Sequence, residues 1–378
     1  MDPEELIAAA RAKEGLEDYG PGDFREPLGV LAAAYDGAGL NEVGRHLIRG
    51  GLVHSLRMRL RAQEWFRRHP EIAEEVVTDP VVVVGMMRSG TTLVQRLLAA
   101  DTRFRCARGW EVVEVAPALD QRFDVADPRI AKAQVREEQS RQWVPELYAI
   151  HPMHALEAEE EIVFLADAFL SHVPESGADV PDYRRWLDDQ DLAPAYDHLH
   201  RMLQLLQWQQ RQREEAARET AARWVLKTPA HLGYLDDLRR RFPDLHVVHL
   251  HRDPVETVAS GASLNATLHR MHADVVDDRR IGREWLERMA WTDARARASE
   301  RRWPAGLVTH LDFADVVADP VGQISQVYDA IGLELTADAV AAMEDWLERR
   351  PREAGRPAYM PEDYGLTPEL IRARFPAG

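Results

Sequence analysis

Apolar residues follow two different periods along the chain, and the period changes near residue 80. Between residues 44 and 69 they recur at roughly helical spacing, and Val81-Val82-Val83-Val84 then forms a β-branched run bounded by Pro80 and Gly85. A short run that is apolar throughout is typical of a strand buried on both faces of a parallel sheet. The helical pattern returns from Thr92 to Ala100. These patterns predict helices over the first 75 residues, followed by a strand–loop–helix unit.

Three later segments repeat the change from strand to helix. They are Trp224–Leu226, His246–Leu250 and Leu307–Leu311, each followed by a helical pattern. Strands that alternate with helices indicate βαβ units and a parallel sheet. We therefore predict an α/β domain over residues 79–378, with a phosphate-loop-containing central parallel sheet flanked by helices. A helical extension over 1–78 precedes it, and the polar residues from about 120 to 220 form a helical insertion.

The net charge and the cysteine count exclude several classes of function. The 378 residues hold 47 Lys and Arg against 64 Asp and Glu, a net charge of −17. This argues against nucleic-acid binding, which needs a basic surface, so an anion must bind in a local basic pocket. Cys106 is the only cysteine, which excludes a disulfide framework and cysteine-rich zinc sites. The beginning of the sequence lacks an apolar signal core and no run approaches 18 apolar residues. We therefore expect a cytoplasmic protein without integral membrane contact.

The segment GMMRSGTT, residues 85–92, joins the first strand to its helix. Its G-x4-G-x-[ST] spacing is that of a loop whose backbone N–H groups converge on a phosphate. The following helix adds positive charge at its N-terminus. Thr91 occupies the place of the lysine that reaches a triphosphate, and the basic residue is Arg88. The predicted contacts to the anion are Arg88, Ser89, Gly90, Thr91 and Thr92.

A second anion site is predicted at the end of the third strand. Arg252 follows this strand, and Ser260 lies eight residues further, about two turns into the next helix. Parallel sheets bind ligands at the carboxyl ends of their strands, where an arginine and a serine can hold a phosphate. The pair alone is weak evidence, since an Arg-Asp-Pro turn is often a capped helix start. Together with the loop at residues 85–92 it indicates a ligand with two phosphate groups.

These motifs resemble those of sulfotransferases that use 3′-phosphoadenosine 5′-phosphosulfate. GMMRSGTT resembles the family's 5′-phosphosulfate loop in the arginine form of tyrosylprotein sulfotransferases, and HLHRDPVETVAS resembles its 3′-phosphate motif. WVLKTPAHL resembles the strand with the catalytic lysine, FADVVADP a segment near the adenine, and EDYGLTPELIRARF the end of bacterial members. The resemblance spans roughly Asp79 to Phe375. It implies sulfuryl transfer from this nucleotide to a hydroxyl group of a small-molecule or lipid acceptor.

The resemblance also implies roles for individual residues. Arg88 and Lys227 are the expected catalytic cations, Arg356 is expected to close over the 3′-phosphate, and no metal is expected. Cytosolic members place a histidine two residues after the lysine, but Pro229 holds that place here. The tyrosylprotein type uses a glutamate after the loop helix, which favours Glu111 as the base. His231 and His154 remain competing bases, and the acidic run at residues 157–161 is interpreted as a solvated helix face.

Two other functions remain open at this point. One is a phosphate-loop kinase-like phosphotransferase, in which Asp312 or Asp315 would have to bind Mg²⁺. The other is a non-catalytic nucleotide-binding protein. We expect the insertion and the N-terminal helices to build the acceptor pocket, with possible aromatic walls at Trp143, Tyr148, Trp186 and Trp208. The sequence does not identify the acceptor or the oligomeric state.

Overall fold

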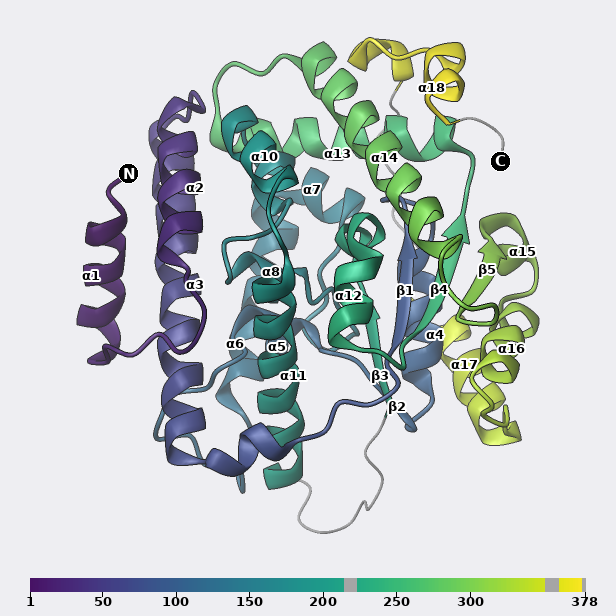
Figure 1. The fold of residues 1–378 in the computed structure, drawn as a ribbon, viewed down its shortest axis with the longest axis horizontal. Coiled ribbons are helices and arrows are strands. Elements are labelled where there is room, and N and C mark those ends of the chain that lie inside the picture. The colour runs from purple at the N-terminus through teal and green to yellow at the C-terminus, as the bar shows by residue number, and fades with distance from the viewer. Residues whose placement is uncertain (214–222, 351–359, 376–378) are drawn as a thin grey trace.

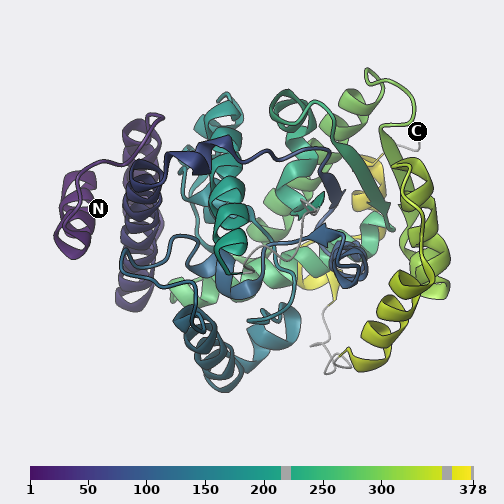
Figure 2. The ribbon, with the colours of Figure 1, turned by 90° about the horizontal axis from the view of Figure 1, so that it is seen from below.

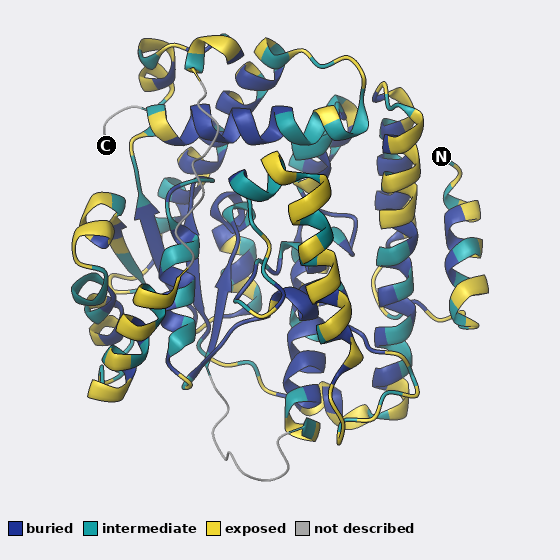
Figure 3. Ribbon diagram, turned by 180° about the vertical axis from the view of Figure 1, so that it is seen from behind, coloured by how far each residue is buried: buried dark blue, intermediate teal, exposed yellow. Residues whose placement is uncertain are grey.

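A five-stranded parallel sheet forms the centre of the molecule, in the order β2-β3-β1-β4-β5. The computed structural model describes residues 1–213, 223–350 and 360–375. The strands are β1 (Val81–Gly85), β2 (Phe104–Arg105), β3 (Arg223–Lys227), β4 (His246–His251) and β5 (Val308–Asp312). Every residue of β1 is buried, as expected for the central strand (Figure 3). The predicted α/β fold with a central parallel sheet is confirmed.

Helices cover both faces of the sheet, as Figure 1 shows. Val81, Val83 and Leu250 face one core, which α4 (Thr91–Ala100), α16 (Pro320–Ala330) and α17 (Ala337–Arg349) complete. The alternate side chains Val82 and Val84 face the larger core on the other side. That core includes residues of η2 (Pro229–Tyr234), α12 (Leu235–Arg241), α13 (Pro254–His272) and α14 (Asp278–Glu300). The unbroken valine run is therefore buried from both sides.

The helices of the predicted N-terminal extension lie on the side of the molecule away from the sheet (Figures 1 and 2). They are α1 (Pro3–Glu14), α2 (Arg25–Gly37), α3 (Glu42–Arg68) and the short η1 (Pro70–Glu74). Asp2 and Asn41 accept hydrogen bonds from the first turns of α1 and α3, and so satisfy N–H groups that have no partner within the helix. Apolar residues of α1, α2 and α3 belong to the same core as those of α13 and α14.

The long segment between β2 and β3 consists mainly of helices that fold back onto the sheet. They are α5 (Gly109–Val113), α6 (Pro128–Trp143), α7 (Pro145–Ile150), α8 (Ile162–Ala166), α9 (Val173–Gly177), α10 (Pro181–Asp188) and α11 (Ala193–Arg213). After β5 follow α15 (Phe313–Ala318), α16 and α17, then η3 (Pro361–Tyr364) and α18 (Pro368–Arg374). None of the helices within the described residues is both long and apolar enough to cross a membrane.

Candidate functional site

The loop after β1 is folded so tightly that two of its positions require glycine. A Cβ atom on Gly85 would lie 2.4 Å from Ser89 Oγ. Gly90 has φ +94, and a Cβ there would lie 2.5 Å from the ring of Phe313. Arg88 also has a positive φ of 76, which is uncommon for a residue with a side chain and concentrates at functional sites. The loop therefore has the compact shape that its glycine spacing predicts.

The loop presents hydrogen-bond donors at its centre. Ser89 is 0% exposed, and its Oγ has no hydrogen-bond partner among the described residues. Buried hydroxyl groups are normally paired, so a lone one in such a loop fits a bound anion. Helix α4 begins directly after Gly90 and directs its first N–H groups and their partial positive charge toward the same place. The residues present therefore fit a phosphate or phosphosulfate group.

The predicted second anion site lies beside this loop. Arg252 donates from Nη1 to the backbone oxygen of Arg88 at 2.9 Å, and Arg88 donates from Nε to Ser260 Oγ at 3.2 Å. The Arg252 guanidinium lies 4.2 Å from the centroid of the Phe313 ring, and its Nε donates to Glu256 at 2.8 Å. These residues meet because β4 pairs with β1 in parallel, so Arg252 follows the sheet edge beside the loop.

Lys227 is buried at the end of β3 and is held by two partners. It is 1% exposed, and its Nζ donates to Thr92 Oγ1 at 3.0 Å and to Glu160 Oε1 at 2.6 Å. Its backbone pairs in register with Val83 of β1, two residues before the loop begins. The structure thus brings the predicted lysine to the predicted phosphate loop.

The acidic run at residues 157–161 is not a solvated helix face, so that interpretation is wrong. Glu159 is 4% exposed and Glu161 only 1%. Each carboxylate in the run binds a side chain from a distant part of the sequence. The pairs are Glu157 with Trp346 Nε1 at 3.1 Å, Glu159 with Arg96 at 3.0 Å, Glu160 with Lys227 at 2.6 Å, and Glu161 with His231 at 2.8 Å. These partners compensate the four carboxylates, of which Glu159 and Glu161 are buried and Glu157 and Glu160 are partly buried.

Glu160 is the carboxylate of this run that contacts Lys227. Burial alone would raise the pKa of Glu160, but the ammonium group of Lys227 and the nearby His151 outweigh burial and lower this pKa below its ordinary value. The side chain of Glu160 retains some exposure and lines the cavity described below. Its carboxylate is therefore ionised at neutral pH.

The three bases considered from the sequence lie in different surroundings. Glu111 is 5% exposed and caps α5 by accepting from Arg108 N at 3.0 Å, and it does not line the cavity. His231 is also buried away from the cavity, between Glu161 and Tyr196. His154 does line the cavity, with Nδ1 2.9 Å from Glu137. The position of Glu111 therefore gives no support to the base expected from the sequence, because its carboxylate is used within the fold.

A cavity of about 1280 Å³ opens at the carboxyl ends of the strands. Arg88, Thr92, Glu160 and Arg252 belong to its lining, together with the charged residues Glu175 and Arg288. Apolar side chains that line it include Ile162, Val173, Leu264, Trp285 and Met289. No described residue before Met87 lines the cavity. The expectation that the N-terminal helices help to build it is therefore wrong. Of the four aromatic residues proposed as walls, only Tyr148 does so.

The family model described as "Sulfotransferase family" matches residues 80–338. The chain belongs to the sulfotransferase family. The match includes the phosphate loop, Glu160, Lys227 and both residues of the second anion site. Arg356, expected to close over the 3′-phosphate, lies beyond the match and outside the described residues.

Two relatives and two solved structures show how far this sulfotransferase resembles known members. The relatives are both named omega-hydroxy-beta-dihydromenaquinone-9 sulfotransferase Stf3, from Mycobacterium bovis and Mycobacterium tuberculosis. Each is 25% identical over 285 residues, which is 69% of this chain but only 65% of the relative's own length. The crystal structure of sulfotransferase STF1 from M. tuberculosis H37Rv matches with a TM-score of 0.86 and 31% identity, covering 99% of this chain and 98% of that one. STF9 from Mycobacterium avium has a TM-score of 0.87 at 24% identity, covering 98% of this chain and 94% of that one, which shows a common fold.

Several residues that line the cavity were not predicted from the sequence. They include Glu160, Arg96 and Trp346. A signal did exist for Glu160, because four carboxylates within five residues cost energy unless cations compensate them. The local sequence does not identify these cations.

Proposed function

We propose that this chain transfers a sulfuryl group from 3′-phosphoadenosine 5′-phosphosulfate to a hydroxyl group of an apolar small-molecule or lipid acceptor. One observation carries the proposal: Arg88 and Thr92 of the phosphate loop and Arg252 of the predicted second anion site line the same cavity, next to the Lys227–Glu160 pair. A nucleotide with phosphate groups at both ends of its ribose needs two such sites. A kinase acting on a nucleoside triphosphate does not need the second one.

The donor would supply the sulfuryl group, and the residues of the chain would bind it by its two charged ends. The backbone of the loop, Ser89 Oγ and the N-terminus of α4 suit the 5′-phosphosulfate. Arg252 and Ser260 suit the 3′-phosphate, with Phe313 beneath the guanidinium to hold it in place. No metal is required by this arrangement, because cations and N–H groups of the protein face the anion.

Glu160 is the proposed base, in place of Glu111. Its carboxylate is ionised and faces the cavity, so it can accept the proton of the acceptor hydroxyl as that oxygen attacks. Lys227 orients this carboxylate and, with Arg88, provides positive charge where negative charge develops on the transferred group. His154 is the alternative base, since it lines the same cavity and is oriented by Glu137.

The acceptor is proposed to be apolar apart from its hydroxyl group. The cavity volume of about 1280 Å³ exceeds the 300–1000 Å³ of ordinary ligand pockets and leaves room for a second substrate beside the nucleotide. Aliphatic and aromatic side chains such as Leu264, Trp285 and Met289 line the cavity, alongside the ion pair of Arg288 with Glu175. The relatives named above carry the name of a menaquinone-derived lipid, which agrees with an isoprenoid alcohol.

Calorimetric titration with 3′-phosphoadenosine 5′-phosphate, compared with AMP and ATP and with or without Mg²⁺, tests the donor site. Tight binding of the bisphosphate independent of Mg²⁺ is expected. Arg252→Ala should weaken it by about 10- to 150-fold, because a charge-assisted contact contributes about 1.5–3 kcal/mol. Arg45→Ala, at an exposed arginine of α3, is the matched control and should bind normally.

Other results of this titration would refute the proposal. Preference for Mg²⁺-ATP would favour the phosphotransferase, and binding of none of the nucleotides would favour a protein without this chemistry. Transfer of radiolabelled sulfate to a panel of phenols, sterols and isoprenoid alcohols then identifies the acceptor class. Highest turnover with a hydrophilic acceptor such as a sugar would contradict the apolar acceptor and leave the donor assignment intact.

A further inference from the structure

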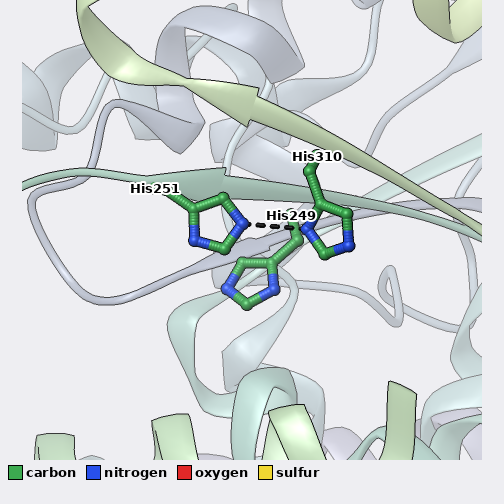
Figure 4. Close-up of side chains that lie close together, drawn as sticks. All are labelled: His249, His251 and His310. Atoms are coloured by element: carbon green, nitrogen blue, oxygen red, sulfur yellow. Dashed lines mark hydrogen bonds between the residues drawn. The ribbon is translucent and has the colours of Figure 1, made fainter. Parts of the chain in front are cut away.

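Three histidines form a cluster on the last two strands of the sheet. His249 and His251 lie two residues apart on β4, so their side chains point to the same face. His310 on β5 is the register partner of His249. The ring centroids are 4.2 Å apart for His249 and His251, 5.1 Å for His251 and His310, and 5.7 Å for His249 and His310 (Figure 4). None of the three lines the cavity of the proposed sulfuryl transfer.

The ring nitrogens of this cluster are arranged as a set of metal ligands would be. One nitrogen from each ring lies within 4.8 Å of the corresponding nitrogens of the other two. His251 Nε2 and His310 Nδ1 are already 2.9 Å apart, within about half an ångström of the separation that a tetrahedral zinc imposes on two nitrogens about 2.0–2.1 Å from the metal. Two rotatable side-chain bonds in each histidine suffice to close the remaining distance.

A carboxylate forms a hydrogen bond with one ring of the histidine cluster. Glu300, at the end of α14, places Oε1 2.7 Å from Nδ1 of His249. A ligating histidine characteristically donates its other ring N–H to a carboxylate, which fixes the tautomer and orients the ring. That bond leaves Nε2 of His249 as the lone-pair nitrogen. The charge of Arg297 also acts on His251 and His310, but this guanidinium is paired with Asp293 at 2.8 Å.

We propose that His249, His251 and His310 bind one divalent transition-metal ion, with Zn²⁺ as the ion that three neutral imidazoles suit best. His310 is exposed and His251 is partly exposed, so water can complete the coordination. Mg²⁺ and Ca²⁺ prefer oxygen ligands and are not expected to bind. The site takes no part in sulfuryl transfer. It holds together the ends of β4 and β5, directly before Arg252 and close to Phe313.

Titration of the full chain with ZnCl₂ after chelator treatment and dialysis tests the proposal. Calorimetry should show one saturable site per chain, and Zn²⁺ should raise the melting temperature while Mg²⁺ should not. Co²⁺ should give the visible d–d absorption of a tetrahedral site. Glu300→Gln should weaken Zn²⁺ binding by about 10- to 100-fold, as is typical for a residue that orients a ligand. His310→Ala should weaken it at least as much.

Matched variants separate this site from general binding by surface histidines. His46→Ala, at an exposed histidine of α3, should bind Zn²⁺ as the wild type does. His310 lies exposed on the edge strand β5, so His310→Ala should keep the metal-free melting temperature of the wild type. Absence of a saturable site in the wild type would overturn the proposal. Equal Zn²⁺ affinity in the wild type and His310→Ala would overturn it as well, and the three rings would then be only a hydrogen-bonded cluster.

Discussion

Replacement of Glu160 by glutamine removes the proposed base and leaves the shape of the site nearly unchanged. The glutamine carbonyl can still accept the hydrogen bond from Lys227 Nζ, which now joins Glu160 at 2.6 Å. The amide cannot accept a proton from the acceptor hydroxyl. We therefore expect kcat to fall by about 10²- to 10⁴-fold, the usual contribution of a general base. Affinity for 3′-phosphoadenosine 5′-phosphate should change by less than about tenfold, since the proposed phosphate contacts are untouched.

The expected loss of turnover corresponds to about 2.7–5.4 kcal/mol of transition-state free energy. The same substitution also affects stability, because Lys227 is 1% exposed and loses its compensating charge. Breaking a buried ion pair completely costs about 3–5 kcal/mol. Here the hydrogen bond to glutamine and the one to Thr92 Oγ1 remain, so we expect the free energy of unfolding to fall by only about 1–3 kcal/mol.

The assay is sulfate transfer to the best acceptor of the panel, at saturating concentrations of both substrates, with urea denaturation of each variant alongside. Glu111→Gln and His154→Gln are the matched controls. Glu111→Gln should lose stability, because it weakens the cap of α5, but should keep near-normal kcat. The reasoning is refuted if Glu160→Gln keeps more than about a tenth of the wild-type kcat. A folded Glu111→Gln variant with a hundredfold loss of kcat would restore the base expected from the sequence.

Three further substitutions probe other parts of the structure. Lys227→Met removes the ammonium group that lowers the pKa of Glu160, so burial should raise this pKa. The acid limb of the kcat–pH profile should then move to higher pH. An acid limb at the wild-type pH in the residual activity of the variant would contradict this. Gly90→Ala forces a side chain into a positive φ and against the Phe313 ring, which should cost about 1–3 kcal/mol and weaken bisphosphate binding in calorimetry, whereas wild-type affinity would disprove the tight fit. Burial raises the pKa of Asp167 from 3.8 to about 7. The folded chain therefore holds this proton more tightly than the unfolded chain, and the stability it confers is lost as the pH rises from about 4 to 7. Asp167→Asn should raise the stability, followed by the melting temperature, by up to about 4 kcal/mol at pH 8 but only by about 1.6 kcal/mol at pH 5, and equal shifts at both pH values would contradict the cause.

Three strands could be predicted because each is a short stretch rich in valine and leucine that is bounded by polar or turn residues. The runs at Val81–Val84, His246–Leu250 and Leu307–Leu311 lie within a residue of β1, β4 and β5. Strand β2 is only the dipeptide Phe104–Arg105, too short to give any periodicity, and it exists because it pairs with β3. A strand could therefore be predicted from the sequence only if it was long enough to give a recognisable pattern.

The phosphate loop and the second anion site could be located because each is a local motif with fixed spacing. Glu160 could not, because its proposed role depends on Lys227, which is 67 residues away on β3, whereas Glu160 itself lies within the helical insertion. A run of glutamates on the solvent-exposed face of a helix would have the same local composition, so the local sequence does not distinguish the two arrangements. Only the return of the insertion to the sheet shows that these carboxylates are buried and paired.

The proposed binding of an anionic nucleotide has to be reconciled with the net charge of −17, and the pairing of charges around the loop bears on this. The cations around the loop are not a bare positive patch, because Lys227 is paired with Glu160, and Arg252 with Glu256. Their partners fix the positions of these side chains, so little reorganisation is needed when an anion binds. Much of the attraction must then come from neutral donors, namely Ser89 Oγ, the loop N–H groups and the N-terminus of α4. Neutral N–H and O–H donors stabilise an anion only when it is in contact with them. A phosphate group can therefore bind selectively in the loop even though the acidic surface of the protein repels anions at longer range.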